Sequence, residues 1–323
     1  MDSQAVGTLP TSTTSEPRER FTRYAWALLG YTLLVILFGA VVRITGSGAG
    51  CGQHWPSCNG ELLQVPRTLK TAIEYTHRAT SGISVVAILG LLVFGFRLYP
   101  ERHAVRSAAV LAGVMIIVEA LIGAMLVKFH LVENDASIGR ALVLPLHLSS
   151  TALLTAALAW CAYFASQSSS ATLPLPNGAR ALLILAGLAV LVVSATGAVT
   201  ALGDTVYPVH GDGLAARLLE DQGASAHLLQ RMRGIHPLLA LAVAAFVAYV
   251  AMVLPGYRTS RDVKRFSLIL AGCVAMQVLA GALNVWLSAP GYMQITHLLL
   301  ANFSWIALIL LAAAARAAEP NAR

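Results

Sequence analysis

Residues 24–44 read YAWALLGYTLLVILFGAVVRI, an apolar run whose single charge, Arg43, lies beside its last residue. A helix of this length spans the ~30 Å hydrocarbon core of a bilayer. Similar stretches recur along the chain at 75–97, 107–127, 142–165, 181–202, 233–254, 266–287 and 293–315. Because a backbone in lipid must satisfy its hydrogen bonds within its own segment, each stretch is expected to be helical. The sequence therefore predicts an all-α integral membrane protein with eight transmembrane helices.

Composition supports the same class. Of 323 residues, 57% are hydrophobic and 11% are charged, where a soluble domain carries roughly 25% charged residues. The formal net charge of +7 is explained by membrane topology and attraction to anionic lipid. No pattern of interleaved basic and aromatic residues indicates nucleic-acid binding, so the lipid bilayer is an expected partner and nucleic acid is not.

The basic residues predict the orientation. The segments on the side of both termini hold thirteen Lys and Arg residues, and the opposite segments hold seven. Because basic residues of short loops stay cytoplasmic, both termini are expected to be cytoplasmic in a multi-pass protein of the cell (inner) membrane. Residues 1–22 are polar and rich in Ser and Thr, and are predicted to be a disordered cytoplasmic tail.

An internal repeat divides the spans into two sets of four. Each odd-numbered span ends in Gly-Ala, and each even-numbered span begins with a histidine. The glycines are Gly39, Gly123, Gly197 and Gly281, and the histidines are His77, His147, His236 and His297. Corresponding glycines lie 158 residues apart, the first histidines of the two sets 159, and the second histidines 150. Such offsets are typical of a duplicated unit.

The repeat predicts two pseudo-two-fold related four-helix bundles. Residues 23–166 would form the N-terminal bundle and residues 181–316 the C-terminal one. A cytoplasmic linker at 167–180 would join them, and a cytoplasmic tail at 317–323 would follow. The even-numbered spans all run from outside to inside, so the four histidines should share one depth in the outer third of the bilayer.

The histidines are the main candidate ligands. An imidazole in hydrocarbon is costly unless it has a partner, so intramembrane histidines indicate function. Two imidazoles from alternate helices of a bundle can ligate one haem iron axially, His77 with His147 and His236 with His297. Zinc is disfavoured because no Cys or carboxylate cluster joins either pair. For the glycines, close helix packing is favoured over contact with a cofactor.

Charged residues flank the first of these sites. Glu74 precedes His77 by three residues, so both project from one helix face and the carboxylate is placed to handle protons. The macrodipole at a helix N-terminus favours a carboxylate there equally well. Arg43 and Arg78 are candidates for pairing with haem propionates, and snorkelling to lipid headgroups explains them as well.

Three further features concern side-chain partners. Glu119 lies in mid-span and its repeat mate is Gln277, which favours a hydrogen-bonding position over a proton channel. Cys51 and Cys58 lie in the first outer loop, where an oxidising environment permits a disulfide. A structural staple is favoured over a redox-active pair. The remaining histidines fall in loops or at span edges and are expected to be solvated: His54, His103, His130, His210 and His227.

Together these features resemble the haem A synthase family. The likeness extends from about Tyr24 to Trp305. It rests on Gly39-Ala-Val-Val-Arg-Ile-Thr-Gly-Ser-Gly, the Cys51 to Cys58 loop with Trp55-Pro56, Glu74-Tyr-Thr-His-Arg and the three later histidines. By this resemblance, the N-terminal half would hold substrate haem O between His77 and His147. The C-terminal half would hold a resident haem b between His236 and His297, and Glu74 would be the catalytic carboxylate.

The resemblance also implies a reaction and partners. The family oxidises the C8 methyl group of haem O to the formyl group of haem A by successive hydroxylations, for biogenesis of haem-copper terminal oxidases. Water is the proposed oxygen donor, and haem b would relay electrons to an acceptor that the sequence does not identify. Haem O would come from a haem O synthase, and a homo-oligomer is left open.

One departure from the family and two rival functions stand beside this interpretation. Some relatives carry a second cysteine pair in the outer loop of the C-terminal half, whereas residues 203–232 have none here. That long polar loop carries Asp204, Asp212, Glu220 and Asp221. A dihaem b-type cytochrome in quinol electron transfer would use the same histidines with Glu74 incidental. A haem carrier or assembly protein would bind haem without chemistry.

Overall fold

The computed structural model describes residues 15–167, 172–208, 220–221, 223 and 226–317. Within these ranges the chain forms eight helices that are long and apolar enough to cross a membrane, and no strand. The helices are α1 (Ser15–Ile44), α2 (Leu69–Leu98), α3 (Ala104–Lys128), α4 (Ile138–Ala165), α5 (Asn177–Val206), α7 (Leu228–Tyr257), α8 (Arg261–Trp286) and α9 (Gly291–Arg316). The predicted all-α membrane fold with eight spans is confirmed.

The first helix begins earlier than expected. Residues 15–22, predicted to be part of a disordered tail, belong to α1. Glu16 lies in the first turn, where the helix macrodipole favours an acidic residue. Its carboxylate is 2.5 Å from the guanidinium of Arg20, and Glu19 stands 3.8 Å from Arg23, so two pairs four residues apart stabilise this polar turn. Residues 1–14 lie outside the described part.

Polar side chains define where several spans begin. Thr68, Ser137 and Ser260 each accept a hydrogen bond from a backbone N–H in the first turn of α2, α4 and α8. His103 does the same for α3, since its Nδ1 accepts from the N–H of Val105 at 3.1 Å. This histidine was expected to be solvated, but it is 7% exposed and its ring lies against Tyr99. Capping, rather than solvation, explains its position.

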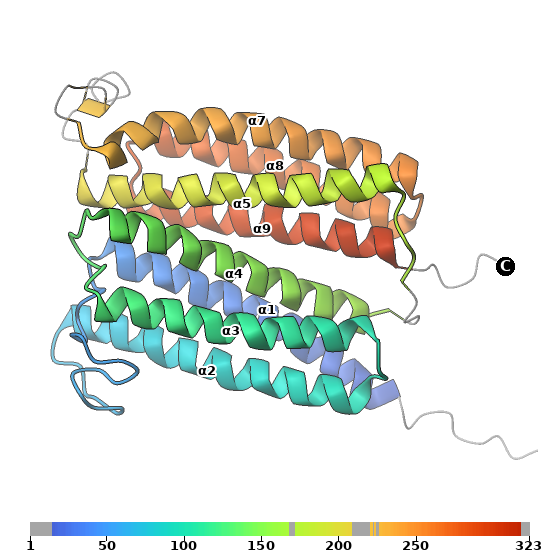
Figure 1. The fold of residues 1–323 in the computed structure, drawn as a ribbon, viewed down its shortest axis with the longest axis horizontal. Helices are drawn as coiled ribbons and strands as arrows, with labels where there is room; N and C mark the ends of the chain where they lie inside the picture. Colours follow the sequence, from blue (N-terminus) through green and yellow to red (C-terminus); the bar gives the residue numbers. More distant parts are fainter. Residues whose placement is uncertain (1–14, 168–171, 209–219, 222, 224–225, 318–323) are drawn as a thin grey trace, which may run out of the picture.

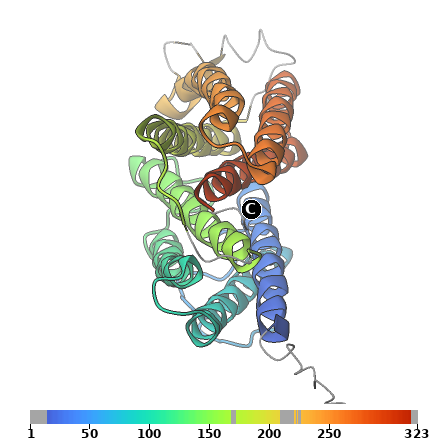
Figure 2. The same cartoon turned by 90° about the vertical axis from the view of Figure 1, so that its right-hand side faces the viewer.

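The helices lie side by side, with the α1–α2 and α3–α4 connections at one end and the described ends of α1 and α9 at the other (Figure 1). The same neighbours touch in both sets of four: α1–α2, α2–α3, α3–α4 and α1–α4, then α5–α7, α7–α8, α8–α9 and α5–α9. Along the boundary, α4 packs against α5 and α9, and α1 against α9 (Figure 2). A pseudo-two-fold relation and a division into two domains stay predictions.

Two hydrogen-bond systems tie the sets together. Near the loop end, Arg43 of α1 donates to the carbonyl of Ala201 at 2.9 Å, to Thr205 Oγ1 at 2.5 Å and to Gln294 Oε1 at 2.9 Å. Deeper in the bundle, Trp305 Nε1 of α9 donates to the carbonyl of Ala152 in α4 at 2.7 Å. Hydrogen bonds between neighbouring helices stabilise a bundle that has no hydrophobic driving force in lipid.

We expect Gly203→Ala to destabilise the protein and Gly187→Ala to leave it intact. A Cβ on Gly203 would lie 2.7 Å from the carbonyl oxygen of Leu229, whereas one on Gly187, in the same helix, meets nothing within 4 Å. Overpacking against backbone costs about 1–3 kcal/mol, and alanine in an open helical position gains up to about 1 kcal/mol. Thermal unfolding in detergent measures the difference. Equal melting temperatures for the two variants would contradict the close approach of α5 and α7.

Candidate functional site

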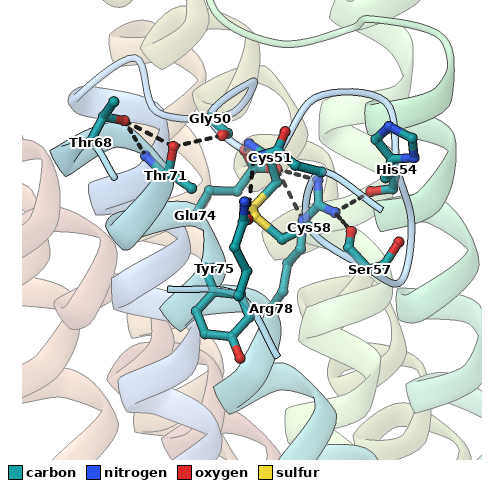
Figure 3. Close-up of a disulfide and its surroundings, with 12 residues drawn as sticks. Gly50, Cys51, His54, Ser57, Cys58, Thr68, Thr71, Glu74, Tyr75 and Arg78 are labelled. Atoms are coloured by element: carbon teal, nitrogen blue, oxygen red, sulfur yellow. Dashed lines mark hydrogen bonds and ion pairs between the residues drawn. A yellow bond between two sulfur atoms is a disulfide. The ribbon is translucent and has the colours of Figure 1, made fainter. Parts of the chain in front are cut away.

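A disulfide-stapled loop covers the start of α2 (Figure 3). Cys51 and Cys58 are joined, as predicted, and both are buried. The loop rests on the first turn of α2, because Thr71 Oγ1 donates to the carbonyl of Gly50 at 2.8 Å. A Cβ on Gly50 would lie 2.6 Å from the carbonyl group of Lys70, so only glycine permits this approach. The disulfide closes the loop, and the contact of Gly50 with the first turn of α2 holds it against that helix.

Glu74 and Arg78 connect that loop to the interior. Glu74 is 3% exposed, and its Oε2 accepts the backbone N–H of Cys51 at 2.7 Å. Its Oε1 accepts from Arg78, whose Nε lies at 3.1 Å. The Nη1 of Arg78 donates to the carbonyls of Ser57, at 2.7 Å, and of His54. The arrangement holds one buried carboxylate, three residues before His77, in a fixed position under the loop (Figure 3).

Three of the four histidines lie against the glycine of the preceding span. A Cβ built on Gly39 would be 3.1 Å from Cε1 of His77, and one on Gly197 or Gly281 would be 3.0 Å from Cε1 of its histidine, His236 or His297. Gly123 has no such neighbour within 4 Å. The glycines therefore serve as flat seats for imidazole rings, a role that the sequence did not predict.

The first histidines of the two halves, His77 and His236, differ in the side chain that contacts the ring. In the C-terminal half, Thr196 Oγ1 lies 3.0 Å from Nδ1 of His236. The mate of Thr196 in the repeat is Phe38, whose ring lies against His77. As a result, Nδ1 of His77 is buried without a hydrogen-bond partner among the described residues. Threonine orients one ring by a hydrogen bond, and phenylalanine positions the other by contact alone.

The second histidines also differ. Nδ1 of His147 lies 2.8 Å from Oε2 of Glu119, and Ser150 Oγ donates to Oε1 of the same carboxylate. In the other half, Nε2 of Gln277 lies 3.2 Å from Nε2 of His297. Glu119 and Gln277 thus occupy hydrogen-bonding positions, as the repeat predicts. They contact opposite nitrogens of their imidazoles.

The histidines fit the donor set that a haem requires. Each half offers two histidines, His77 with His147 and His236 with His297. All four rings are half-buried. Nδ1 of His77, of His147 and of His297 is buried and makes no hydrogen bond within the described part, although Nδ1 of His147 lies 2.8 Å from Glu119. Paired neutral imidazoles with unfilled bonding capacity are suitable axial ligands.

A residue that the sequence did not single out occupies the counterpart of Glu74. Arg233 follows Glu74 by 159 residues, the same offset that relates His77 to His236. It is 3% exposed, its Nε lies 3.0 Å from Asp204 and its Nη1 lies 2.8 Å from Asp221. It also donates to the carbonyls of Gly203, at 2.7 Å, and of Tyr207. The repeat offset was the signal that could have identified it.

Other predicted residues lie elsewhere or beyond the described ranges. Arg43 does not join Arg78, since its guanidinium bonds α5 and α9 across the boundary. Asp212 and His210, in the C-terminal outer loop, fall outside the described residues. Pairing of Arg43 or Arg78 with propionates stays a prediction.

Comparison with known proteins identifies the family. A model described as cytochrome oxidase assembly protein, COX15-CtaA, matches residues 22–70 and 64–309. The chain belongs to this family. It is 42% identical over 296 residues to a protoheme IX farnesyltransferase of Thermus thermophilus, in an alignment that covers 92% of the chain and 48% of that relative. A heme A synthase of Bacillus mycoides is 36% identical over 107 residues, which is 33% of the chain and 34% of that relative.

The chain spans about half the length of the Thermus relative. The two relatives are named for different activities, one a farnesyltransferase and the other a synthase. The resemblance to haem A synthases inferred from the motifs is confirmed at the level of the family.

We expect Gly197→Val to release a histidine and Gly123→Val to be tolerated. The branched side chain at 197 would occupy the space of the His236 ring, whereas a Cβ at 123 meets nothing within 4 Å. Mutating an outer-shell group that orients a metal ligand typically costs 10- to 100-fold in metal affinity. The ratio of haem to purified protein measures the effect. If Gly197→Val retained as much haem as Gly123→Val, the glycine seat would have no bearing on ligation.

Proposed function

We propose that this member of the cytochrome oxidase assembly family is a haem A synthase, which oxidises the C8 methyl group of haem O to a formyl group. The observation that carries the proposal is the buried Glu74 beside His77, present in one half of a chain whose two halves both offer a pair of histidines. The partial likeness to a heme A synthase of Bacillus mycoides supports it.

The two histidine pairs would have different tasks. His77 and His147 would hold the substrate haem O, and His236 and His297 a resident haem b. When bound, haem b supplies a one-electron acceptor close to the substrate. The overall change is –CH₃ + H₂O → –CHO + 4 e⁻ + 4 H⁺, with water as the oxygen donor and an external acceptor receiving the electrons.

Glu74 would accept protons from the reacting centre. Removing electrons from a methyl group leaves positive charge, which a nearby carboxylate stabilises while it takes up a proton. The N–H of Cys51 and the guanidinium of Arg78 orient the two oxygens of Glu74. Since Arg78 also bonds the loop carbonyls of His54 and Ser57, the carboxylate lies directly below the outer loop, a short route for protons to leave.

The counterpart of Glu74 supports placing the chemistry in the N-terminal half. Arg233 stands at the equivalent position beside His236, and its guanidinium is engaged with Asp204 and Asp221. A guanidinium stays protonated in proteins and cannot act as a base. The C-terminal half therefore has a cation where the N-terminal half has a proton acceptor, which suits a resident haem better than a reacting one.

The proposal includes a location and partners. The protein would lie in the inner membrane with both termini cytoplasmic and the haem sites toward the outer side, as the basic loops indicate. A haem O synthase would deliver the substrate. A homo-oligomer and the identity of the electron acceptor are open to experiment.

A second candidate function comes from the Thermus relative, which is named a farnesyltransferase acting on protoheme IX. The chain matches 48% of that protein, so the transferase activity and the matched segment need not coincide. Farnesyl transfer requires no proton acceptor beside an axial histidine. The two functions differ in substrate, because one consumes haem B and the other haem O.

We expect wild-type protein to accumulate haem A when co-expressed with a haem O supply, and Glu74→Gln and His77→Ala to abolish it. Glu74→Gln removes the proton acceptor but keeps the shape, so loss of product should exceed about 100-fold while the protein stays folded. Glu61→Gln, an exposed outer-loop substitution, is the matched control and should retain activity. Acid extraction and chromatography of haems provide the measurement.

The outcomes separate the candidates. Formation of haem O when haem B is the only haem supplied would identify a farnesyltransferase. Bound haem b with unchanged haem O would identify a dihaem cytochrome. Full formation of haem A by Glu74→Gln would remove the carboxylate from the mechanism. Bound haem O that stays unconverted in the wild type and in Glu74→Gln alike would identify a carrier.

A further inference from the structure

The second histidine of each half faces a different group on the preceding span, a carboxylate for His147 and a neutral amide for His297. In the N-terminal half, Glu119 of α3 presents an oxygen 2.8 Å from Nδ1 of His147 in α4. At the equivalent position of α8, Gln277 presents a neutral amide to His297 of α9. The two positions lie 158 residues apart, so one repeat offset relates a carboxylate to an amide.

Oε2 of Glu119 lies at ion-pair distance, 2.8 Å, from Nδ1 of His147, and its charge favours a proton on that nitrogen. A carboxylate can only accept, so the proton of the neutral imidazole resides on Nδ1 and the lone pair resides on Nε2. A histidine that donates its second N–H to a carboxylate is held in orientation and becomes a more basic ligand. Glu119 is itself held by Ser150 Oγ and is 11% exposed, so water does little to screen its charge.

His297 has no comparable support. The amide nitrogen of Gln277 can only donate, so at 3.2 Å it meets the lone pair of Nε2 and offers no negative charge to the ring. Haem ligation through Nε2 of His297 would displace this amide, whereas the group that faces His147 lies on Nδ1 and leaves Nε2 clear.

We propose that Glu119 is a positioning residue that makes His147 a strong electron donor to the iron bound in the N-terminal half. The inference rests on the proposed function, because it assigns the substrate haem to that half. A more basic axial ligand favours ferric over ferrous iron, and second-sphere hydrogen bonds are a recognised means of tuning haem potential. Glu119 thus stabilises the oxidised iron of the substrate, and Gln277 provides no such charge in the other half.

The test is a spectroelectrochemical titration of the full chain carrying His236→Ala, which leaves haem in the N-terminal half only. Glu119→Gln keeps an oxygen that accepts from Nδ1–H and removes the charge. We expect the reduction equilibrium to shift about tenfold toward ferrous iron, equivalent to ~59 mV for one electron, with the bis-histidine spectrum unchanged. Ser150→Ala keeps the charge and removes a donor to it, so a smaller shift in the opposite direction should follow.

Gln277→Glu in the same background is the matched control, because it adds a carboxylate at the equivalent place in the other half. It should change the reduction equilibrium constant of the haem in the N-terminal half by less than twofold. If Glu119→Gln and Gln277→Glu shift the potential equally, or Glu119→Gln shifts it less than twofold, the role of Glu119 is refuted while haem binding stands. If the His236→Ala protein binds no haem through His77 and His147, the proposed function fails and this inference fails with it.

Discussion

The cost of placing imidazoles in a low-dielectric interior governs the outer part of this bundle. A polar ring in hydrocarbon must be hydrogen-bonded, seated against backbone or bound to a ligand. The chain uses the first two of these means, since Thr196 lies within hydrogen-bonding distance of His236, and Gly39, Gly197 and Gly281 provide backbone seats. Glu119 also places a carboxylate 2.8 Å from His147. The staple, the buried carboxylate and the buried arginine surround these rings and depend on their placement.

The repeat spacing predicts one duplicated scaffold, and paired positions in its two halves carry different residues. Phe38 against Thr196, Glu74 against Arg233, and Glu119 against Gln277 each change the chemistry around a histidine without altering which helices touch. Glu74 and Arg233 are buried, Glu119 is half-buried, and each is paired with residues of its own half. The asymmetry is therefore local, and the shared backbone arrangement tolerates it.

Composition was enough to predict the spans, and two cysteines in one loop were enough to predict the disulfide, because both are properties of the chain itself. The sequence could not predict partners brought together by folding. Arg78 bonds Glu74 and the loop carbonyls, and His103, which was expected in solvent, caps α3. In the sequence, Arg233 counts only as one of the basic residues that predict orientation. The residues next to it in the chain do not show that folding brings Asp204 and Asp221 to its guanidinium.

The bridge made by Arg43 has a consequence for how the two halves can change over evolutionary time. One of its acceptors is the main-chain carbonyl of Ala201, and the others are the side chains of Thr205 and Gln294. Every residue has a main-chain carbonyl, so a substitution at position 201 keeps this acceptor and requires no compensating change at Arg43. Among the acceptors of Arg43, only Thr205 and Gln294 can show substitutions that correlate with changes at position 43. The hydrogen bond to the carbonyl of Ala201 would not be detectable in a sequence alignment.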